Sequence, residues 1–337
     1  MHSTRSARRV ALALGCAVSL VAVGSALALQ KPGRTIIRNG SVRLVALNQA
    51  SFAYMVARSK NDCDHVELWN TDNKGIWRFG RLGPCTNLGS TGTGISSLGV
   101  SGNRALWVRY TGGNTREWQL LTATATQRTP RQLRFVAQDV DLPTPFVIGD
   151  STGGQGIPYA AGSDVVLLGA GGAAVFKRTE PARITRVTSG KGPAGGVVAA
   201  LRETGEVVML RVDGSLAWTV GYEPREVKAI ALAPVGLIVQ LAGEVQIRMP
   251  TGSSSVDLPP GAAMTDFSEG RILYTLKNEI HAFRISNDKD TLLLASARGA
   301  PAIIATADAH GLGWARGRSV DFACGGCVRY TTGATTG

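Results

Sequence analysis

The sequence has few charged residues, few histidines and little helical periodicity. Charged residues make up 18% of the 337 positions, and only 4 are histidine; typical soluble domains are about 25% charged. After residue 30 the best helical stretch is 227–243, and Pro234 would interrupt its hydrogen-bond ladder. The chain is nevertheless 44% apolar, which is enough to bury a core. We therefore expect a folded chain without long helices.

The motifs of several enzyme classes are missing as well. No G-x-x-x-x-G-K loop and no H-x-x-x-H spacing occurs in the sequence. We therefore assign no catalytic, cofactor-binding or metal-binding residue. The best polar candidates are Asp308 and His310, which lie two positions apart in a turn. Asp139, Asp141 and Asp150 form a modest acidic group, interpreted here as a solvated loop.

Glycine, by contrast, is abundant, and the apolar residues come in short runs. There are 42 glycines, and runs of five to eight residues are bounded by Gly, Asn, Asp, Ser or Pro. Many runs alternate apolar and polar positions, as at 41–47, 66–69 and 245–249. This alternation is typical of half-buried β-strands joined by tight turns. The sequence predicts an all-β fold.

A turn followed by an apolar strand recurs along the chain. It reads SGNRALWV, AGSDVVLL, APVGLIVQ, SEGRILYT and AHGLGWAR, starting at residues 101, 161, 233, 268 and 309, with looser copies at 47–56 and 192–201. We interpret each copy as a turn that leads into the inner strand of a blade, followed by outer strands. The copies recur about every 44 residues, within the range of propeller blades. Seven copies predict a β-propeller of seven four-stranded blades, although the ambiguous stretch 138–160 leaves six or eight open.

The two ends of the repeating region predict how the ring closes. The last copy, 302–330, has room for only three strands, and an additional strand at 34–38 precedes the first copy. Pairing the N-terminal strand into the last blade would complete the ring and cover an exposed edge. We place the propeller domain at residues 34–330 and a disordered tail at 331–337.

These turns and strands resemble the WD40-like and TolB-like β-propeller repeats of exported bacterial proteins. The Trp-Asp ending of true WD40 blades and the full Pro-Asp-Gly turn of TolB-like repeats are missing. The resemblance therefore implies a fold and a tendency to bind partners, and it carries no residue-level site.

The N-terminus has the form of an export signal. Three arginines within residues 1–9 precede an uncharged stretch at 10–29, and Ala26-Leu27-Ala28 is a small-x-small cleavage sequence. We predict a signal peptide at residues 1–28 and an extracytoplasmic location, secreted or associated with the cell envelope. An uncleaved anchor ending near residue 29 and a lipoprotein signal at Cys16 are the alternatives.

Cysteine use fits an oxidising compartment. Cys63 and Cys85 flank a predicted hairpin (65–71 and 75–80), and Cys324 and Cys327 form a Cys-x-x-Cys around two glycines. We interpret all four as disulfide candidates, the first pair stabilising by about 3 kcal/mol. A redox or metal role of Cys-x-x-Cys is the alternative, and the sequence does not decide among the three possible pairings.

The charge points to anionic partners. The formal charge is +12, and residues 1–28 hold three arginines and no acid, so the remainder carries +9. We expect a non-catalytic binding or scaffold module whose partner is a protein, a glycan or an anionic cell-wall polymer. We expect no nucleic acid, no cofactor, and contact with a membrane only through an uncleaved anchor. The alternatives are an exported hydrolase or lyase with its site at the channel mouth, and a structural envelope protein.

Overall fold

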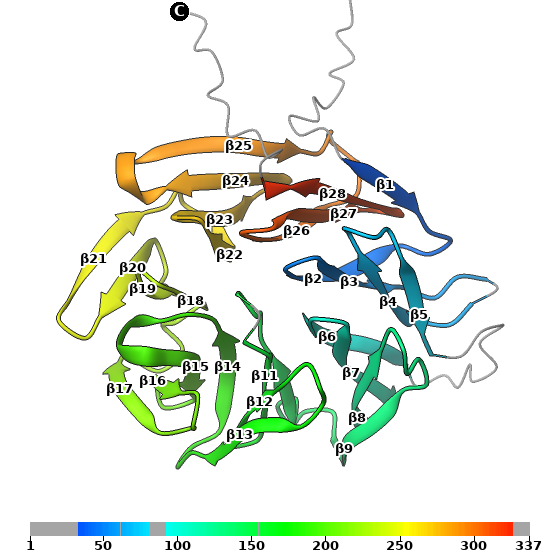
Figure 1. The fold of residues 1–337 in the computed structure, drawn as a ribbon, viewed down its shortest axis with the longest axis horizontal. Helices are drawn as coiled ribbons and strands as arrows, with labels where there is room; N and C mark the ends of the chain where they lie inside the picture. The colour runs from blue at the N-terminus through cyan, green and yellow to red at the C-terminus, as the bar shows by residue number, and fades with distance from the viewer. Residues whose placement is uncertain (1–32, 61, 81–91, 154, 326–337) are drawn as a thin grey trace, which may run out of the picture.

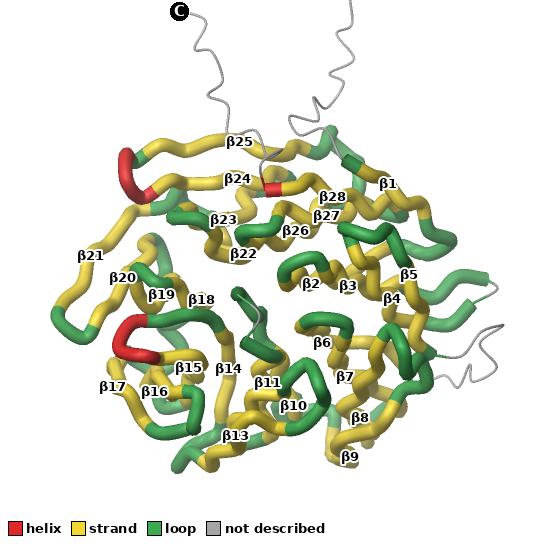
Figure 2. Tube along the Cα trace, in the orientation of Figure 1, coloured by secondary structure: helices red, strands yellow, loops and turns green. Residues whose placement is uncertain are grey.

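The computed structural model describes residues 33–60, 62–80, 92–153 and 155–325, which fold into seven four-stranded antiparallel sheets. The sheets stand around a common axis as the blades of a β-propeller (Figure 1). Strands and loops account for nearly all of the tube in Figure 2. The described residues include the 3₁₀ turns Pro193–Gly195 and Ile285–Asn287. In this part of the chain no helix has the length and apolarity needed to span a membrane. The predicted all-β propeller of seven blades is confirmed.

The blades follow one another in chain order. Blade 1 is β2 (Val42–Asn48), β3 (Ser51–Val56), β4 (His65–Asn70) and β5 (Ile76–Phe79); blade 2 is β6 (Thr93–Ser101), β7 (Arg104–Gly112), β8 (Thr115–Thr124) and β9 (Arg131–Asp139); blade 3 is β10 (Phe146–Ile148), β11 (Ile157–Ala161), β12 (Asp164–Leu168) and β13 (Ala174–Thr179); blade 4 is β14 (Ile184–Ser189), β15 (Gly196–Arg202), β16 (Glu206–Arg211) and β17 (Leu216–Gly221). Blade 5 is β18 (Ala229–Ala233), β19 (Gly236–Gln240), β20 (Glu244–Met249) and β21 (Gly252–Asp257); blade 6 is β22 (Ala263–Ser268), β23 (Arg271–Leu276), β24 (Glu279–Arg284) and β25 (Lys289–Ala295); blade 7 is β26 (Ile303–Asp308), β27 (Gly311–Arg316), β28 (Ser319–Cys324) and the N-terminal strand β1 (Arg34–Ile37).

The ring closes through the N-terminal strand, as the sequence predicts. Strand β1 pairs antiparallel with β28, with Arg34 opposite Phe322 and Ile37 opposite Ser319. Two backbone hydrogen bonds extend this ladder, from Gly33 N to Phe322 O at 2.7 Å and from Arg38 N to Arg318 O at 2.9 Å. The last blade is therefore built from both ends of the described chain.

The core lies between the blades. Each of seven clusters of buried apolar side chains joins two neighbouring blades: Leu68 of blade 1 shares a cluster with Trp107 of blade 2, and Phe322 of blade 7 shares one with Phe52 of blade 1. Burial on both sheet faces explains why the middle strands read as continuous apolar runs. Stability therefore depends on the contact between blades.

One prediction about the blades is wrong. The apolar strand after each recurring turn is the second strand of its blade in six copies, and in AGSDVVLL it is the third, β12. The first strands lie innermost and include exposed positions, as in β22, while second strands such as β3 are buried throughout. Because the first strands border a partly open channel, the most continuously apolar strand is the next one out.

Two further segments can be compared with their predictions. The stretch 227–243 forms β18 and β19 with a turn at Pro234, and the predicted hairpin after Cys63 is β4 and β5. The predicted signal at 1–28, its alternatives and the tail at 331–337 lie outside the described residues and stay predictions.

Candidate functional site: the central channel and a basic cleft

The first strands of the blades line the axis of the ring. Strands β2, β6, β10, β14, β18, β22 and β26 contact one another in sequence around it, as Figure 1 shows. Side chains at the ends of these strands therefore meet across the axis, although they are far apart in the chain. The channel is therefore a candidate ligand-binding site.

A loop of blade 3 enters the channel. Residues 149–153, called the channel loop here, follow the three-residue strand β10 and lie inside the ring in Figures 1 and 2. The Asn48 side chain on β2 donates hydrogen bonds to Ser151 O at 2.9 Å and to Ser151 Oγ at 3.1 Å. Thr152 Oγ1 donates to Leu232 O on β18 at 3.2 Å. The loop is thus held by blades on opposite sides of the ring.

The channel loop also pairs with β14 through its backbone. Thr152 N donates to Ser189 O and Ser189 N donates to Asp150 O, both at 2.9 Å. The loop begins so close to β14 that a Cβ atom on Gly149 would lie 1.6 Å from Val187 O. Position 149 therefore requires glycine for packing rather than for backbone conformation.

Two acidic residues, Asp150 and Asp266, line the same cavity of the channel. Asp266 on β22 is buried, and its carboxylate accepts hydrogen bonds from Thr306 Oγ1 and Ala307 N, both at 3.0 Å, and from Phe267 N at 2.8 Å. Asp150 of the channel loop is accessible to solvent, and no hydrogen bond or ion pair of its carboxylate is found within the described residues. A buried, well-bonded acid and an unbonded one therefore share this space.

The pKa values of both acids are raised. Desolvation raises the pKa of Asp150 to about 6, since protein surrounds this side chain closely even though water reaches it. Burial and the negative charge of Asp150 together raise the pKa of Asp266 to about 8, against the opposing effect of the hydrogen bonds from Ala307, Phe267 and Thr306. The pair accordingly favours holding a proton or another cation.

A cavity of about 210 Å³ contains the two acids. Residues of β10, β14, β18 and β22 and the channel loop line it, with Thr188, Thr265 and Met264 among them. Its volume falls below the range of about 300–1,000 Å³ typical of sites for drug-sized ligands. It suits water, an ion or one long side chain.

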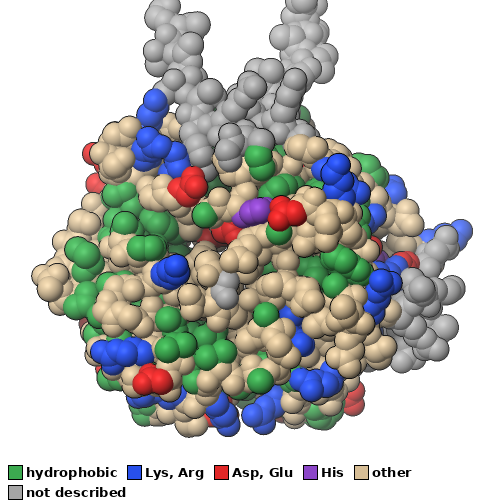
Figure 3. Space-filling model, in the orientation of Figure 1, with side chains coloured by type: hydrophobic (Ala, Val, Ile, Leu, Met, Phe, Trp, Pro, Cys, Tyr) green, Lys and Arg blue, Asp and Glu red, His purple; other side chains and the backbone are tan. Residues whose placement is uncertain are grey.

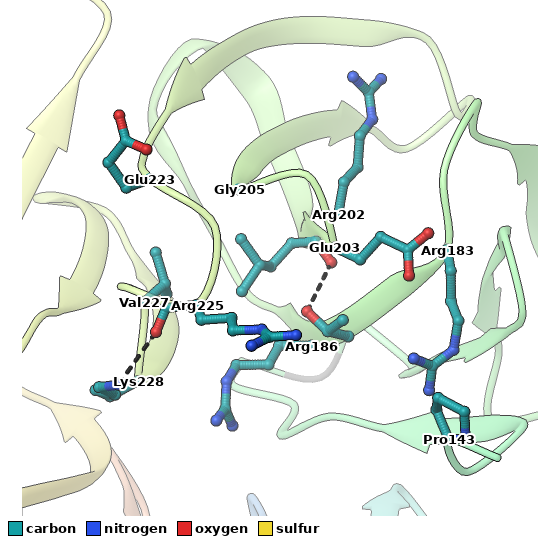
Figure 4. A pocket seen from close by; sticks show the side chains of 12 residues that line it. Pro143, Arg183, Arg186, Arg202, Glu203, Gly205, Glu223, Arg225, Val227 and Lys228 are labelled. Atoms are coloured by element: carbon teal, nitrogen blue, oxygen red, sulfur yellow. Dashed lines mark hydrogen bonds between the residues drawn. The ribbon is translucent and has the colours of Figure 1, made fainter.

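A larger cleft, of about 580 Å³, opens at the other end of β14 (Figure 4). Five basic and two acidic side chains border it, together with five other residues: Arg183, Arg186, Arg202, Arg225, Lys228, Glu203, Glu223, Pro143, Thr185, Leu201, Gly205 and Val227. Strand β14 runs from Ile184 beside the cleft to Ser189 beside the channel loop. Thr185 and Arg186 line both the cleft and the channel cavity, so the two spaces are neighbours.

The cations of the cleft differ in whether they are already paired. Arg202 forms ion pairs with Glu180 and with Glu206, the latter at 2.6 Å. Arg186 and Arg225 are exposed and have no carboxylate partner in the part of the chain that the structure describes. Desolvation lowers the pKa of Arg186, which remains a cation at neutral pH because its ordinary pKa is above 12. Two guanidinium groups are therefore available to an anion.

Lys and Arg side chains are spread around the rim of the face drawn in Figure 3 rather than gathered in one patch. In the cleft, five Lys and Arg residues border one concave surface. This concentration distinguishes the cleft from the general positive charge of the chain.

The predicted polar candidates, Asp308 and His310 of blade 7, make contacts with residues of blade 1. Asp308 is buried, and its carboxylate accepts hydrogen bonds from His310 N at 2.8 Å, Gly311 N at 3.2 Å and Gln49 N. Burial raises the pKa of Asp308, and these backbone donors oppose the rise. The ring of His310 lies 3.0 Å from Asp72 of blade 1 through Nε2. Both residues thus stabilise turns, and the structure pairs the histidine ring with a different acid.

The cysteine predictions fall partly outside the described structure. Cys63 precedes β4 and Cys324 ends β28, whereas Cys85 and Cys327 lie outside the described residues. Both predicted disulfides therefore stay predictions. Among residues 33–60, 62–80, 92–153 and 155–325 no group of three His, Cys, Asp or Glu side chains could hold a metal ion.

Sequence reasoning missed most of the channel site. Asp150 is not part of a solvated acidic loop with Asp139 and Asp141, since it lies inside the ring. Asp266 stands in a buried stretch of β22, between Met264 and Phe267. An acid within a buried strand was the signal that could have drawn attention to it.

Comparison with known proteins supports the fold. No protein-family model matches the sequence, and a search of curated proteins found no significant relative. Among solved structures the chain is similar to one in the crystal structure of a mitotic checkpoint complex, at 12% identity and a TM-score of 0.54 over 95% of this chain and 99% of that one. It is also similar to the WD40 domain of Pan2 from Neurospora crassa, at 9% identity and a TM-score of 0.50 over 84% and 88% of the two chains.

A bacterial structure shows the same likeness. PorZ of Porphyromonas gingivalis, described as an essential surface component of the type-IX secretion system, matches at 13% identity and a TM-score of 0.51. The match covers 87% of this chain and 38% of PorZ. At such identities the likeness establishes the propeller fold and nothing about activity.

Proposed function

We propose that this chain is an exported, non-catalytic binding module that holds an acidic partner protein at the basic cleft. The observation that carries the proposal is the pair of guanidinium groups, Arg186 and Arg225, that face a concave surface without carboxylate partners among the described residues. Arginine binds carboxylates through two parallel hydrogen bonds, so it provides geometry as well as charge. The propeller places both residues beside the same cleft.

The fold is consistent with this function. Propellers bring loops from every blade to two flat ends, which suits them to hold other macromolecules. One of the similar structures belongs to a protein complex and another to a bacterial surface component, which is compatible with binding and with export. The N-terminal sequence carries the proposal of export, through its arginines, apolar stretch and Ala26-Leu27-Ala28.

Binding of the labelled peptide Glu-Glu-Gly-Gly-Gly-Glu-Glu, measured by fluorescence anisotropy, tests the proposed site. We expect the double variant Arg186→Gln/Arg225→Gln to bind at least tenfold more weakly than the wild type in 50 mM salt. The control Arg128→Gln/Arg298→Gln removes the same charge from two exposed positions away from the cleft, and should bind like the wild type. Equal loss in both variants would show that only the overall positive charge attracts the peptide.

The proposed export has its own test. N-terminal sequencing of the protein recovered from outside the cytoplasm should begin near Leu29. Recovery of the full-length chain in a membrane fraction would instead support the uncleaved anchor, and recovery only from the cytoplasm would overturn export.

A further inference from the structure

We propose that the basic cleft and the channel cavity form one composite site, which takes a partner segment with a lysine side chain flanked by acidic residues. This inference rests on the proposed function and adds to it the residues that the partner must carry. The cleft would bind the acidic flanks, and the channel cavity would take the lysine.

The two spaces are close enough for one short segment to occupy both. Thr185 and Arg186 of β14 line each of them. Strand β14 has six residues, so its first and last residues are separated by about 17 Å at about 3.3 Å per residue. A segment of a few residues can therefore rest on the cleft while a single long side chain enters the channel.

The cleft selects carboxylates but is unsuited to a densely anionic polymer. Arg186 and Arg225 offer unpaired guanidinium groups, and Lys228 donates to Arg225 O at 3.1 Å. Glu203 and Glu223 line the same cleft and are exposed. A chain with a negative charge on every unit would approach these two glutamates, whereas a peptide can place neutral or basic residues beside them.

The channel cavity has the opposite preference. Asp150 and Asp266 line the same cavity and lie close enough for the charge of Asp150 to raise the pKa of Asp266. Arg186 lies where this cavity borders the cleft, and neither it nor another cationic side chain of the described residues pairs with either carboxylate. The carboxylate of Asp150 has no bonding partner among those residues. An ammonium group placed between the two acids would relieve their repulsion and donate up to three hydrogen bonds.

The size of the cavity fits this ligand. About 210 Å³ admits one unbranched side chain, and Met264 and Ile148 provide apolar wall for its methylene groups. The channel loop forms part of the wall and is tied to blades 1, 4 and 5, so the cavity is preformed. A lysine therefore pays little reorganisation cost on entering.

Three labelled heptapeptides that differ only at the central residue test the proposal with the purified chain. The probes are Glu-Glu-Gly-Lys-Gly-Glu-Glu and the same peptide with norleucine or glutamate in place of lysine. We expect the lysine peptide to bind about five- to tenfold more tightly than the norleucine peptide at pH 7.5, the range of one partly buried ion pair. The glutamate peptide should bind most weakly of the three, because it would place a third carboxylate beside Asp150 and Asp266.

Variants assign the effect to each half of the site. Asp150→Asn should abolish the advantage of lysine over norleucine and leave the affinity for the norleucine peptide unchanged. Arg186→Gln/Arg225→Gln should weaken the binding of all three peptides. Asp257→Asn, at an exposed position on β21, is the matched control for loss of a carboxylate and should change nothing.

The outcomes separate this inference from the function on which it rests. Equal binding of lysine and norleucine peptides, with loss in the double arginine variant, would overturn the composite site and leave the cleft as an acidic-peptide site. An advantage of lysine that survives Asp150→Asn would also overturn it. Binding of no peptide, or binding insensitive to the arginines, would overturn both proposals. Inorganic polyphosphate is added as a fourth probe. If it binds more tightly than all three peptides, the proposed peptide ligand is wrong and the site binds a phosphate polymer.

Discussion

Arg38 Nε lies 2.6 Å from Glu67 Oε2, and this ion pair joins the end of the closing strand to the first blade. The hydroxyl of Tyr54 donates to the same Glu67 oxygen at 2.7 Å. Burial by itself raises the pKa of Glu67, but hydrogen bonds from His65 and Tyr54 and the charge of Arg38 outweigh it, so this pKa lies below its ordinary value. The N-terminal segment is therefore bound to blade 7 by the backbone hydrogen bonds between β1 and β28, and to blade 1 by the ion pair of Arg38 with Glu67.

Breaking this pair should destabilise the ring. Glu67→Gln leaves the guanidinium of Arg38 without its charged partner; because the Arg38 side chain is 21% exposed, we expect a cost below the about 3–5 kcal/mol typical of a fully buried pair. We expect a lower Tm in a thermal scan, with deletion of residues 34–39 producing a larger drop because the whole β1–β28 ladder is lost. Glu117→Gln, at an exposed position, is the control. An unchanged Tm after the deletion would show that β1 does not close the ring in solution.

The channel acids should make stability fall as pH rises. Both pKa values are raised in the folded chain, so between about pH 4 and pH 8 the folded state binds more protons than the unfolded state. The protonated pair contributes fully at the acidic end of this window, and its contribution is lost as pH rises. Asp150→Asn removes the repulsion and should raise Tm more at pH 8 than at pH 5. A pH-independent difference between variant and wild type would contradict this account, and Asp257→Asn provides the control.

Glycine at position 149 should be required for the channel loop. In Gly149→Ala the new methyl group would overlap Val187 O, and either the loop or β14 must move. We expect a loss of about 2 kcal/mol, within the range for overpacked sites, measured by denaturant unfolding. Gly243→Ala is the comparison, since nothing lies within 4 Å of its added Cβ. Equal stability of the two variants would mean that the loop does not pack on β14 as described.

The four cysteines after residue 28 should be oxidised in the exported protein. Mass spectrometry of an unreduced digest should recover a Cys63–Cys85 link and a Cys324–Cys327 link. Reduction should lower the stability by about 3 kcal/mol for the first loop in the chain-entropy model. Free thiols in protein taken from outside the cytoplasm would contradict both links.

The architecture was largely readable from the sequence because it depends on local spacing. Turns near 101, 233 and 268 recur at intervals typical of propeller blades, and the shortage of one strand at the C-terminal end matches the surplus strand at the N-terminal end. The prediction placed the apolar strand after each turn innermost in its blade, and this was wrong, because apolar content does not indicate which strand is innermost. In blade 3 the short β10 and the channel loop also displaced the repeat by one strand.

The candidate site depends on distant contacts, and for this reason the sequence did not show it. Asp150 and Asp266 come from blades 3 and 6 and meet only across the closed ring. Arg186 lies near the start of the first strand of blade 4, and Arg225 shortly before that of blade 5. If the first strand of each blade had been assigned correctly from the sequence, these two arginines would have been placed at the same end of neighbouring first strands. That placement would have predicted a basic cleft between blades 4 and 5.

The closing ladder has a consequence for how the chain acquires its shape. Thr35 bonds to Asp321, a partner 286 positions away, through Oγ1 and Oδ1. A ribosome delivers the N-terminal strand first, and a translocon that threads the chain from its leading end would do the same. Strand β1 must then wait, unpaired, until nearly everything else has been made. Contacts so distant in sequence form slowly, and exposed edges invite aggregation in the meantime. The interval before closure is therefore when this molecule most needs a chaperone.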